Sequence, residues 1–161
     1  MDDTIIPPRV KISGHYVNSI LAKTEAVLSG FDEAILLNQD GNVSEGSGEN
    51  LFLIYNGVLN TPLVSDNNLT GITRDCAIKI AQNEFGLKVV ERSIRRSELY
   101  LADEVFLTGT AAHITPVGSL DNRLIGNGNV GSITKNIREI YLKSIRGDNE
   151  DYQEWLTEVK V

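Results

Sequence analysis

The chain is best interpreted from residues 43–52, which read Val-Ser-Glu-Gly-Ser-Gly-Glu-Asn-Leu-Phe. Two carboxylates and two glycines alternate here in a short loop, and the apolar run Leu51–Tyr55 follows as a strand. Gly46 and Gly48 lack a Cβ, so their backbone can take positive φ and approach a flat ligand closely. A carboxylate beside such glycines, Glu45 or Glu49, can be directed at a ring nitrogen. An acidic hairpin turn is the alternative interpretation.

Bulk composition sets mild limits on the class of protein. A length of 161 residues suits one domain with a real core. The formal net charge of -7 and the isoelectric point near 4.8 argue against a nucleic-acid partner. No apolar segment approaches the roughly 20 residues needed to span a bilayer, so we expect no membrane insertion.

Cysteine and histidine usage bears on the compartment and on metal binding. Cys76 is the only cysteine, which rules out an intrachain disulfide and is compatible with a reducing compartment. The two histidines show no His-x-x-His spacing and give no metal site. The acidic start Met1-Asp2-Asp3 differs from the basic start of a signal peptide. We therefore expect a cytoplasmic protein without a bound metal.

Apolar periodicity and turn signals predict alternating helices and strands. Helices are predicted over His15–Ser29, Thr73–Phe85, Arg96–Leu101 and Ser132–Ser144. Strands are predicted over Glu33–Asn38, from Val43 onward, and over Leu51–Tyr55, Val58–Asn60, Lys88–Arg92, Glu104–Leu107, Ile114–Leu120 and Leu124–Ile125. The last segment, Tyr152–Val159, is predicted to be loosely docked with Trp155 as its anchor.

These elements predict one mixed α/β domain (α+β) over residues 11–161. Residues 1–10 contain Pro7 and Pro8, which favour extended backbone, and this segment is predicted to be a connector. Because a connector normally has a domain on each side, we expect the chain to be a piece of a longer protein.

Three further segments could supply groups for chemistry with the 43–52 loop. Lys11 precedes Gly14 and Tyr16, although most lysines in such a context are simply solvated. Residues 69–75, Leu-Thr-Gly-Ile-Thr-Arg-Asp, begin a helix whose free N–H groups can bind an anion. The alternative there is an ordinary helix capped by Thr70 or Thr73. In residues 106–117, a buried strand ends in Thr-Gly-Thr and is followed by two alanines, small residues that leave backbone N–H groups accessible.

Taken together and in this order, the four segments resemble branched-chain amino acid aminotransferases, which are fold type IV enzymes that use pyridoxal 5′-phosphate. In that family the lysine of a Lys-x-x-Gly-x-Tyr pattern forms a Schiff base with the cofactor, which implies Lys11 as the catalytic residue. The resemblance also implies that Tyr16 contacts the phenolic oxygen of the cofactor. The first glutamate of Glu-Gly-x-Gly-Glu-Asn, here Glu45, is implied as the partner of the ring nitrogen.

The segment that opens the second predicted helix also matches the family. The resemblance implies that Leu69 packs against the pyridine ring and that the backbone amides of Ile72 and Thr73 hold the phosphate. Relatives usually have proline where this chain has Thr70, a mild departure. Arg74 follows the helix start, and we expect its side chain to point away from the phosphate. No other lysine or arginine of the chain is expected to clamp that group.

The Gly-Thr-Ala-Ala turn completes the implied site. The resemblance gives the Thr110 hydroxyl to the phosphate and the backbone amides of Ala111 and Ala112 to the substrate carboxylate, with Thr110 adjoining the substrate as well. Relatives often have glutamate after the alanines, where this chain has His113. We expect His113 to be structural, because the family already has a lysine for proton transfer.

The resemblance implies the large, C-terminal domain of such an enzyme, with a pseudo-barrel of strands flanked by helices. It also implies a smaller N-terminal domain that this chain lacks and that supplies an arginine for the phosphate. The whole enzyme would be a homodimer or a higher homo-oligomer. Its reaction would be transamination of leucine, isoleucine or valine with 2-oxoglutarate, for amino-acid biosynthesis. The fragment alone is expected to be impaired.

Other interpretations remain open at this point. D-amino acid aminotransferases and aminodeoxychorismate lyases share the fold, the lysine and the glutamate. A non-catalytic domain that serves only in oligomerisation is a further alternative. A nucleotide-binding module does not fit, because neither Gly-x-x-x-x-Gly-Lys-[Ser/Thr] nor Gly-x-Gly-x-x-Gly after a strand occurs.

Overall fold

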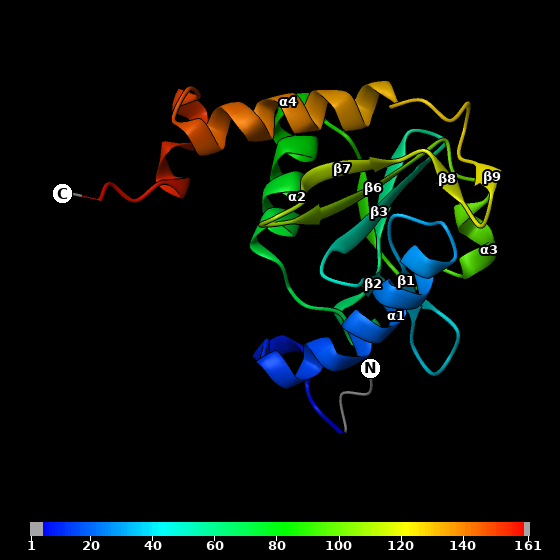
Figure 1. Cartoon of the computed structure of the whole chain (residues 1–161). Coiled ribbons are helices and arrows are strands. Elements are labelled where there is room, and N and C mark those ends of the chain that lie inside the picture. The colour runs from blue at the N-terminus through cyan, green and yellow to red at the C-terminus, as the bar shows by residue number, and fades with distance from the viewer. Residues whose placement is uncertain (1–4, 160–161) are drawn as a thin grey trace.

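The computed structural model describes residues 5–159 and has the mixed α/β character that the sequence predicts (Figure 1). The helices are α1 (Tyr16–Leu28), α2 (Ile72–Phe85), α3 (Arg96–Leu99) and α4 (Ser132–Arg146). Short 3-10 helices lie at Pro8–Val10, Ser13–His15, Val64–Asp66 and Glu150–Trp155. The strands are β1 (Ile35–Leu37), β2 (Val43–Gly46), β3 (Asn50–Tyr55), β4 (Val58–Thr61), β5 (Val89–Glu91), β6 (Glu104–Gly109), β7 (His113–Val117), β8 (Ser119–Leu120) and β9 (Arg123–Leu124).

Five of the strands form one sheet in the order β5-β4-β3-β6-β7, and all neighbours in it are antiparallel except β4 and β5. The hairpins β1-β2 and β8-β9 form two smaller sheets. Two-residue turns set the register of the β3-β4 hairpin and of the β8-β9 hairpin. Asn56 and Gly57 both have positive φ, as do Asp121 and Asn122, which matches the backbone twist of two-residue hairpin loops.

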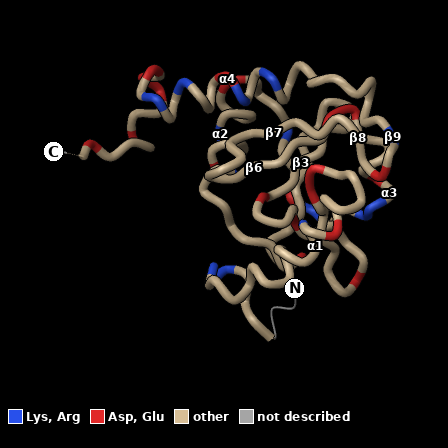
Figure 2. The backbone as a smooth tube through the Cα atoms, in the orientation of Figure 1, with Lys and Arg blue, Asp and Glu red and all other residues tan. Residues whose placement is uncertain are grey.

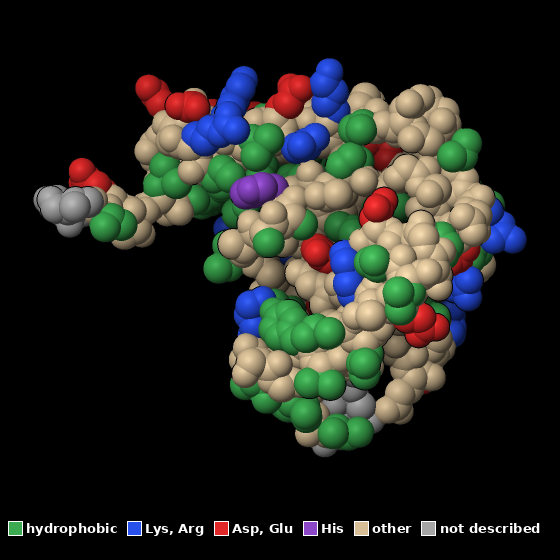
Figure 3. Space-filling view, in the orientation of Figure 1, with side chains coloured by type: hydrophobic (Ala, Val, Ile, Leu, Met, Phe, Trp, Pro, Cys, Tyr) green, Lys and Arg blue, Asp and Glu red, His purple; other side chains and the backbone are tan. Residues whose placement is uncertain are grey.

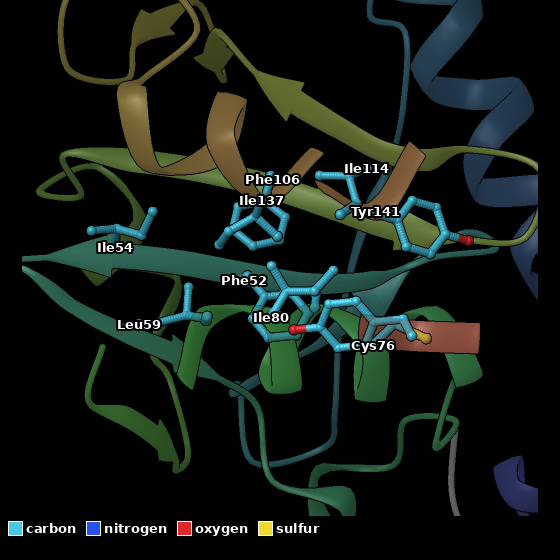
Figure 4. Close-up of a cluster of buried hydrophobic side chains, with 12 residues drawn as sticks. Phe52, Ile54, Leu59, Cys76, Ile80, Phe106, Ile114, Ile137 and Tyr141 are labelled. Atoms are coloured by element: carbon cyan, nitrogen blue, oxygen red, sulfur yellow. The ribbon is translucent and has the colours of Figure 1, made fainter. Parts of the chain in front are cut away.

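One face of the five-stranded sheet packs against α2 and α4 (Figures 1 and 4). Phe52 of β3 and Phe106 of β6 are cross-strand partners in the centre of this face, and their rings stack with centroids 4.9 Å apart. Ile80 of α2 and Ile137 of α4 cover them and are completely buried. Each buried side chain of this kind contributes about 1.5–3 kcal/mol relative to an exposed one. The rigid sheet therefore fixes where α2 begins.

The other face of the sheet packs against the second core cluster. Leu51 and Leu53 of β3 point there, together with Val43 of β2 and Leu99 of α3. Residues along β3 thus alternate between two cores, and the strand is buried over Asn50–Ile54. Because β3 packs against both core clusters, its first residues hold the end of the preceding loop in a fixed position.

Two sequence predictions need correction at the ends of the chain. The predicted connector lies partly outside the described residues, and within it Pro8–Val10 forms a 3-10 turn in place of extended backbone. At the other end, Tyr152 is buried and its hydroxyl donates to Glu84 at 2.8 Å, so Tyr152 anchors the segment more than the half-buried Trp155 does.

The apolar stripe of α1 faces outward. Val17, Ile20, Leu21 and Leu28 are between 59% and 83% exposed, and Ser19 is the buried residue of this helix. Figure 3 shows hydrophobic side chains gathered over the lower part of the molecule, where α1 and the N-terminal segment lie. By contrast, α4 carries two lysines, two arginines and one glutamate along its length and presents a solvated face (Figure 2).

None of the helices formed by residues 5–159 is long and apolar enough to cross a membrane. Over the same residues, no group of three or more His, Cys, Asp or Glu side chains could hold a metal ion.

Candidate active site

The four segments singled out in the sequence meet around one cavity of about 270 Å³. It lies between the N-terminal segment with α1, the β2–β3 loop, the start of α2 and the end of β6. Seven of the nine predicted site residues line it: Lys11, Tyr16, Glu45, Leu69, Ile72, Thr73 and Thr110. Residues almost a hundred positions apart are thus brought together. Ala111 and Ala112 follow Thr110 in the β6–β7 turn but do not line the cavity.

Glu45 is the carboxylate that is hydrogen-bonded to the loop before α2. It lies on β2 next to the turn glycines, and its Oε2 accepts a hydrogen bond from the backbone N–H of Leu69 at 3.0 Å. Burial raises the pKa of this carboxyl, while the Leu69 amide lowers it. Lys11 also lowers the pKa and Glu49 raises it by their charges. The group is therefore oriented by the loop that leads into α2.

Glu49 lines the same cavity but is folded back on its own loop. Its Oε2 accepts from the backbone N–H of Gly48 at 3.0 Å. A Cβ on Gly46 would lie 2.8 Å from that same oxygen, so the glycine leaves room for the carboxylate. Burial raises the pKa of Glu49, and the neighbouring Glu33 raises it further. The two glutamates of the loop thus have different partners, which their spacing alone does not reveal.

Lys11 has a backbone conformation that non-glycine residues seldom adopt. Its φ of 49° and ψ of 43° are left-handed, at the end of the Pro8–Val10 turn. The side-chain Nζ donates to the Tyr16 hydroxyl at 3.0 Å and lies 5.7 Å from the centroid of that ring. Unusual backbone of this kind occurs preferentially at functional sites. The lysine and the tyrosine predicted to act together are therefore in contact.

The first turn of α2 has no side-chain cap. Gly71 is the N-cap residue, and neither Thr70 nor Thr73 caps the helix as the alternative interpretation required. The first N–H groups of a helix have no intrahelical acceptor, so those of Ile72 and Thr73 are available to an anion. Arg74 is buried and donates to Pro62 O and to Glu91, away from the cavity, as expected.

The end of β6 adds hydroxyl groups to the cavity. Thr110 is exposed at the rim, and Thr108 lines the wall. Thr108 is 1% exposed, and its Oγ1 has no hydrogen-bond partner among the described residues. A buried hydroxyl without a partner is costly, which indicates a ligand or an ordered water in the complete site. His113 lies outside the cavity, and its ring faces that of Tyr141 at 6.1 Å between centroids.

Sequence reasoning missed three contributors to this cavity. Thr108 stands two residues before Thr110 in the quoted Thr-Gly-Thr, where strand alternation could have indicated it. Asn50 ends the quoted loop and also lines the cavity. Arg9 lines it as well, although from the sequence no cation other than Arg74 is expected near a phosphate.

Comparison with known proteins shows the family of the chain. The family model for amino-transferase class IV matches residues 2–120. The chain belongs to this family. It is 57% identical over 98% of its length to a probable branched-chain-amino-acid aminotransferase of Aquifex aeolicus, of which it covers 51%. It is 46% identical to the branched-chain-amino-acid aminotransferase of Escherichia coli, with 96% of this chain and 50% of the relative covered.

Solved structures of the class IV family show the same fold. A branched-chain amino acid aminotransferase of Thermobaculum terrenum, in its pyridoxal phosphate form, matches with a TM-score of 0.97 and 42% identity, over all of this chain and 52% of that one. The branched-chain aminotransferase of the archaeon Thermoproteus uzoniensis, solved with norvaline, matches with a TM-score of 0.92 and 46% identity, covering 98% and 52% of the two chains. The fold type IV prediction is confirmed. This chain spans about half the length of the curated relatives that it matches.

Proposed function

We propose that this chain forms the pyridoxal phosphate-binding part of a branched-chain amino acid aminotransferase, which exchanges an amino group between leucine, isoleucine or valine and 2-oxoglutarate. The observation that carries the proposal is the cavity where Lys11, Glu45 and the uncapped start of α2 meet. The two relatives named above, a probable and an established branched-chain-amino-acid aminotransferase, support the choice of substrate.

The donors around the cavity fit a phosphate-bearing cofactor. An anion at the start of α2 would receive the amides of Ile72 and Thr73 and the positive end of the helix dipole, worth about half an elementary charge. Thr108, whose buried hydroxyl has no partner among the described residues, and Thr110 add hydroxyl donors. A dianion needs further positive charge, which Arg9 adds at the cavity wall.

The proposed roles follow from the contacts of each side chain. Pyridoxal phosphate, when bound, supplies an aldehyde that reacts with amines and a protonated ring that withdraws electrons. Lys11 would provide the amine that holds the aldehyde carbon until the amino group of the substrate displaces it, and the freed amine would then move the proton at the substrate Cα. Glu45, oriented by the Leu69 amide, holds the proton on the ring nitrogen. Tyr16, in contact with Lys11 Nζ, orients the phenolic oxygen.

Two further groups are assigned on position. Leu69 lies on the cavity wall beside Glu45, where it would pack against the face of the ring. The amides of Ala111 and Ala112, together with Thr110, would bind the substrate carboxylate at the exposed β6–β7 turn.

We further propose that the enzyme is a homodimer or a higher homo-oligomer and acts in amino-acid biosynthesis in the cytoplasm. The exposed stripe of α1 supports self-association, because monomers seldom expose a contiguous apolar patch of this kind. The free, buried Cys76 is compatible with a reducing compartment.

A single-turnover experiment tests the reaction. The complete natural protein is loaded with pyridoxal phosphate and mixed with L-leucine, with D-alanine as the control. We expect the branched 2-oxo acid to form in one equivalent per bound cofactor, and D-alanine to remain unchanged. Reaction of D-alanine alone would assign the protein to another fold type IV activity. Bound cofactor without either reaction would contradict a catalytic function.

A further inference from the structure

The backbone N–H and C=O of Leu69 are both hydrogen-bonded to side chains of the segment 43–52. Its N–H donates to Glu45 Oε2 at 3.0 Å, and its C=O accepts from Asn50 Nδ2 at 2.6 Å. Asn50 is 6% exposed, lines the cavity and pairs with Thr108 across the β3–β6 ladder. The proposed roles assign nothing to this asparagine, although it contacts the loop that orients Glu45.

Asn50 also fits closely against the beginning of α2. A Cβ built on Gly71, the N-cap residue, would lie 2.2 Å from Asn50 Oδ1. Gly71 has a φ of -72°, which any residue can adopt, so the backbone itself does not require glycine there. The absence of a side chain at position 71 is therefore needed for the contact with Asn50.

We propose that Asn50 is a positioning residue that fixes the distance between the Glu45 carboxylate and the N-terminus of α2. This inference rests on the proposed function, in which these two places receive the ring nitrogen and the phosphate of one cofactor. Asn50 begins the central strand β3, which is buried between both cores, whereas residues 67–71 form a loop. The hydrogen bond from its side-chain amide to the carbonyl oxygen of Leu69 joins that loop to the sheet.

Further hydrogen bonds hold the first part of the same loop. Ser44 Oγ donates to the carbonyl oxygen of Asn67 at 2.8 Å. Asp66 Oδ1 accepts from Asn38 Nδ2 at 3.0 Å and from Asn42 Nδ2 at 3.1 Å. These contacts lie before Leu69, whose backbone N–H and C=O are held by Glu45 and Asn50. Asn50 is therefore the side chain that ties the carbonyl oxygen of Leu69, two residues before the N-cap Gly71, to strand β3.

Four variants test this role. Asn50→Ala removes the donor, and Gly71→Ala displaces the same side chain by a steric clash. The double variant removes the clash partner, so its effect should be smaller than the sum of the single effects. Asn60→Ala is the matched control, because Asn60 is equally buried and also bonds a backbone carbonyl, that of Val58, but does not line the cavity.

Two readouts separate positioning from a general loss of stability. The first is the dissociation constant for pyridoxal phosphate, and the second is the titration of the Glu45 carboxyl followed by carbon NMR and assigned with Glu45→Gln. We expect Asn50→Ala and Gly71→Ala to weaken cofactor binding about tenfold or more, as loss of one buried hydrogen bond implies. Both should move the Glu45 titration to higher pH, since a loosened Leu69 amide stabilises the carboxylate less. Asn60→Ala should change neither readout.

Unchanged binding and an unmoved Glu45 titration in Asn50→Ala would overturn the inference while leaving the proposed function intact. A wild-type protein that takes up no pyridoxal phosphate would instead overturn the proposed function. In that case the Glu45 titration still decides the role of Asn50: a shift in Asn50→Ala and not in Asn60→Ala supports it, and no shift contradicts it.

Discussion

At the scale of single residues, Glu45 and Glu49 differ in what holds them. Glu45 is bonded to the Leu69 amide of the loop that enters α2, whereas Glu49 is bonded to Gly48 within its own turn. Glu45→Gln should lower the transamination rate about 10²–10³-fold, because electrostatic terms of this type are worth about 2.7–4 kcal/mol. Glu49→Gln should act only through loop geometry and cost less. Steady-state rates of both variants with L-leucine check this, and an equal or larger loss in Glu49→Gln would reverse the assignment.

The burial of Glu45 also predicts a dependence of stability on pH. Its folded-state pKa is raised above the ordinary value of 4.5, chiefly by burial. Between the ordinary pKa and the raised one, the folded state binds more protons than the unfolded state, so the free energy of unfolding falls as pH rises through this window. A glutamine does not titrate.

Without cofactor, Glu45→Gln should therefore be more stable than the wild type at pH 7, and the difference should vanish below pH 4.5. Urea unfolding of both proteins across pH 4 to 8 measures it. A variant less stable than the wild type at pH 7 would show that the Leu69 hydrogen bond outweighs the burial of the charge.

At the scale of elements, the start of α2 is expected to hold a phosphate with the help of Thr110. Thr110→Val removes one hydroxyl at the cavity rim and should weaken pyridoxal phosphate binding about ten- to hundredfold, since a hydrogen bond to a charged group is worth about 1.5–3 kcal/mol. Thr115→Val is the control, because Thr115 bonds Ala112 O on the exposed side of β7 and does not line the cavity. Absorbance titrations compare the two. Equal affinities would remove Thr110 from the phosphate site.

The elements themselves could be predicted from the sequence more fully than their contacts. Apolar period and turn residues located α2 to within one residue at its start, and the Asn56-Gly57 hairpin was predicted from its dipeptide. The missing cap of α2 could not be predicted, because Thr70 is a good cap by type and only the packing of Gly71 on Asn50 selects the glycine. The same holds for Arg9, whose place depends on the turn at Pro8–Val10.

At the scale of the whole molecule, α1 is the helix whose apolar stripe no part of residues 5–159 covers. The spacing of its apolar residues predicts the helix correctly. The same spacing does not tell whether the apolar stripe packs against the core of this chain or against another surface. We expect the stripe to pack against a second copy in the proposed oligomer. Leu21→Glu should therefore shift the protein toward monomer in sedimentation velocity. Leu124→Glu, at an equally exposed leucine on β9, should leave the oligomer unchanged. The same sedimentation profile for both variants and the wild type would exclude this face.

The affinity for the cofactor is a second property of the whole molecule. The relatives that this chain matches are about twice as long as it is. We expect the 161-residue chain to bind pyridoxal phosphate at least about tenfold more weakly than a complete relative, because the dianion loses counter-charge. Arg9 limits this difference, and Arg9→Ala should widen it. Fluorescence titration of chain, variant and complete relative measures the effect, and equal affinities for all three would contradict it.

The central claim is that Lys11 is the amine of a pyridoxal phosphate site. The direct measurement is borohydride reduction of the cofactor-loaded protein, followed by mass mapping of the modified peptide. We predict one reduced pyridoxyl adduct on Lys11, next to Tyr16, and its loss in Lys11→Ala with an unchanged circular dichroism spectrum. An adduct on any other lysine, or trapping that persists in Lys11→Ala, would contradict the account.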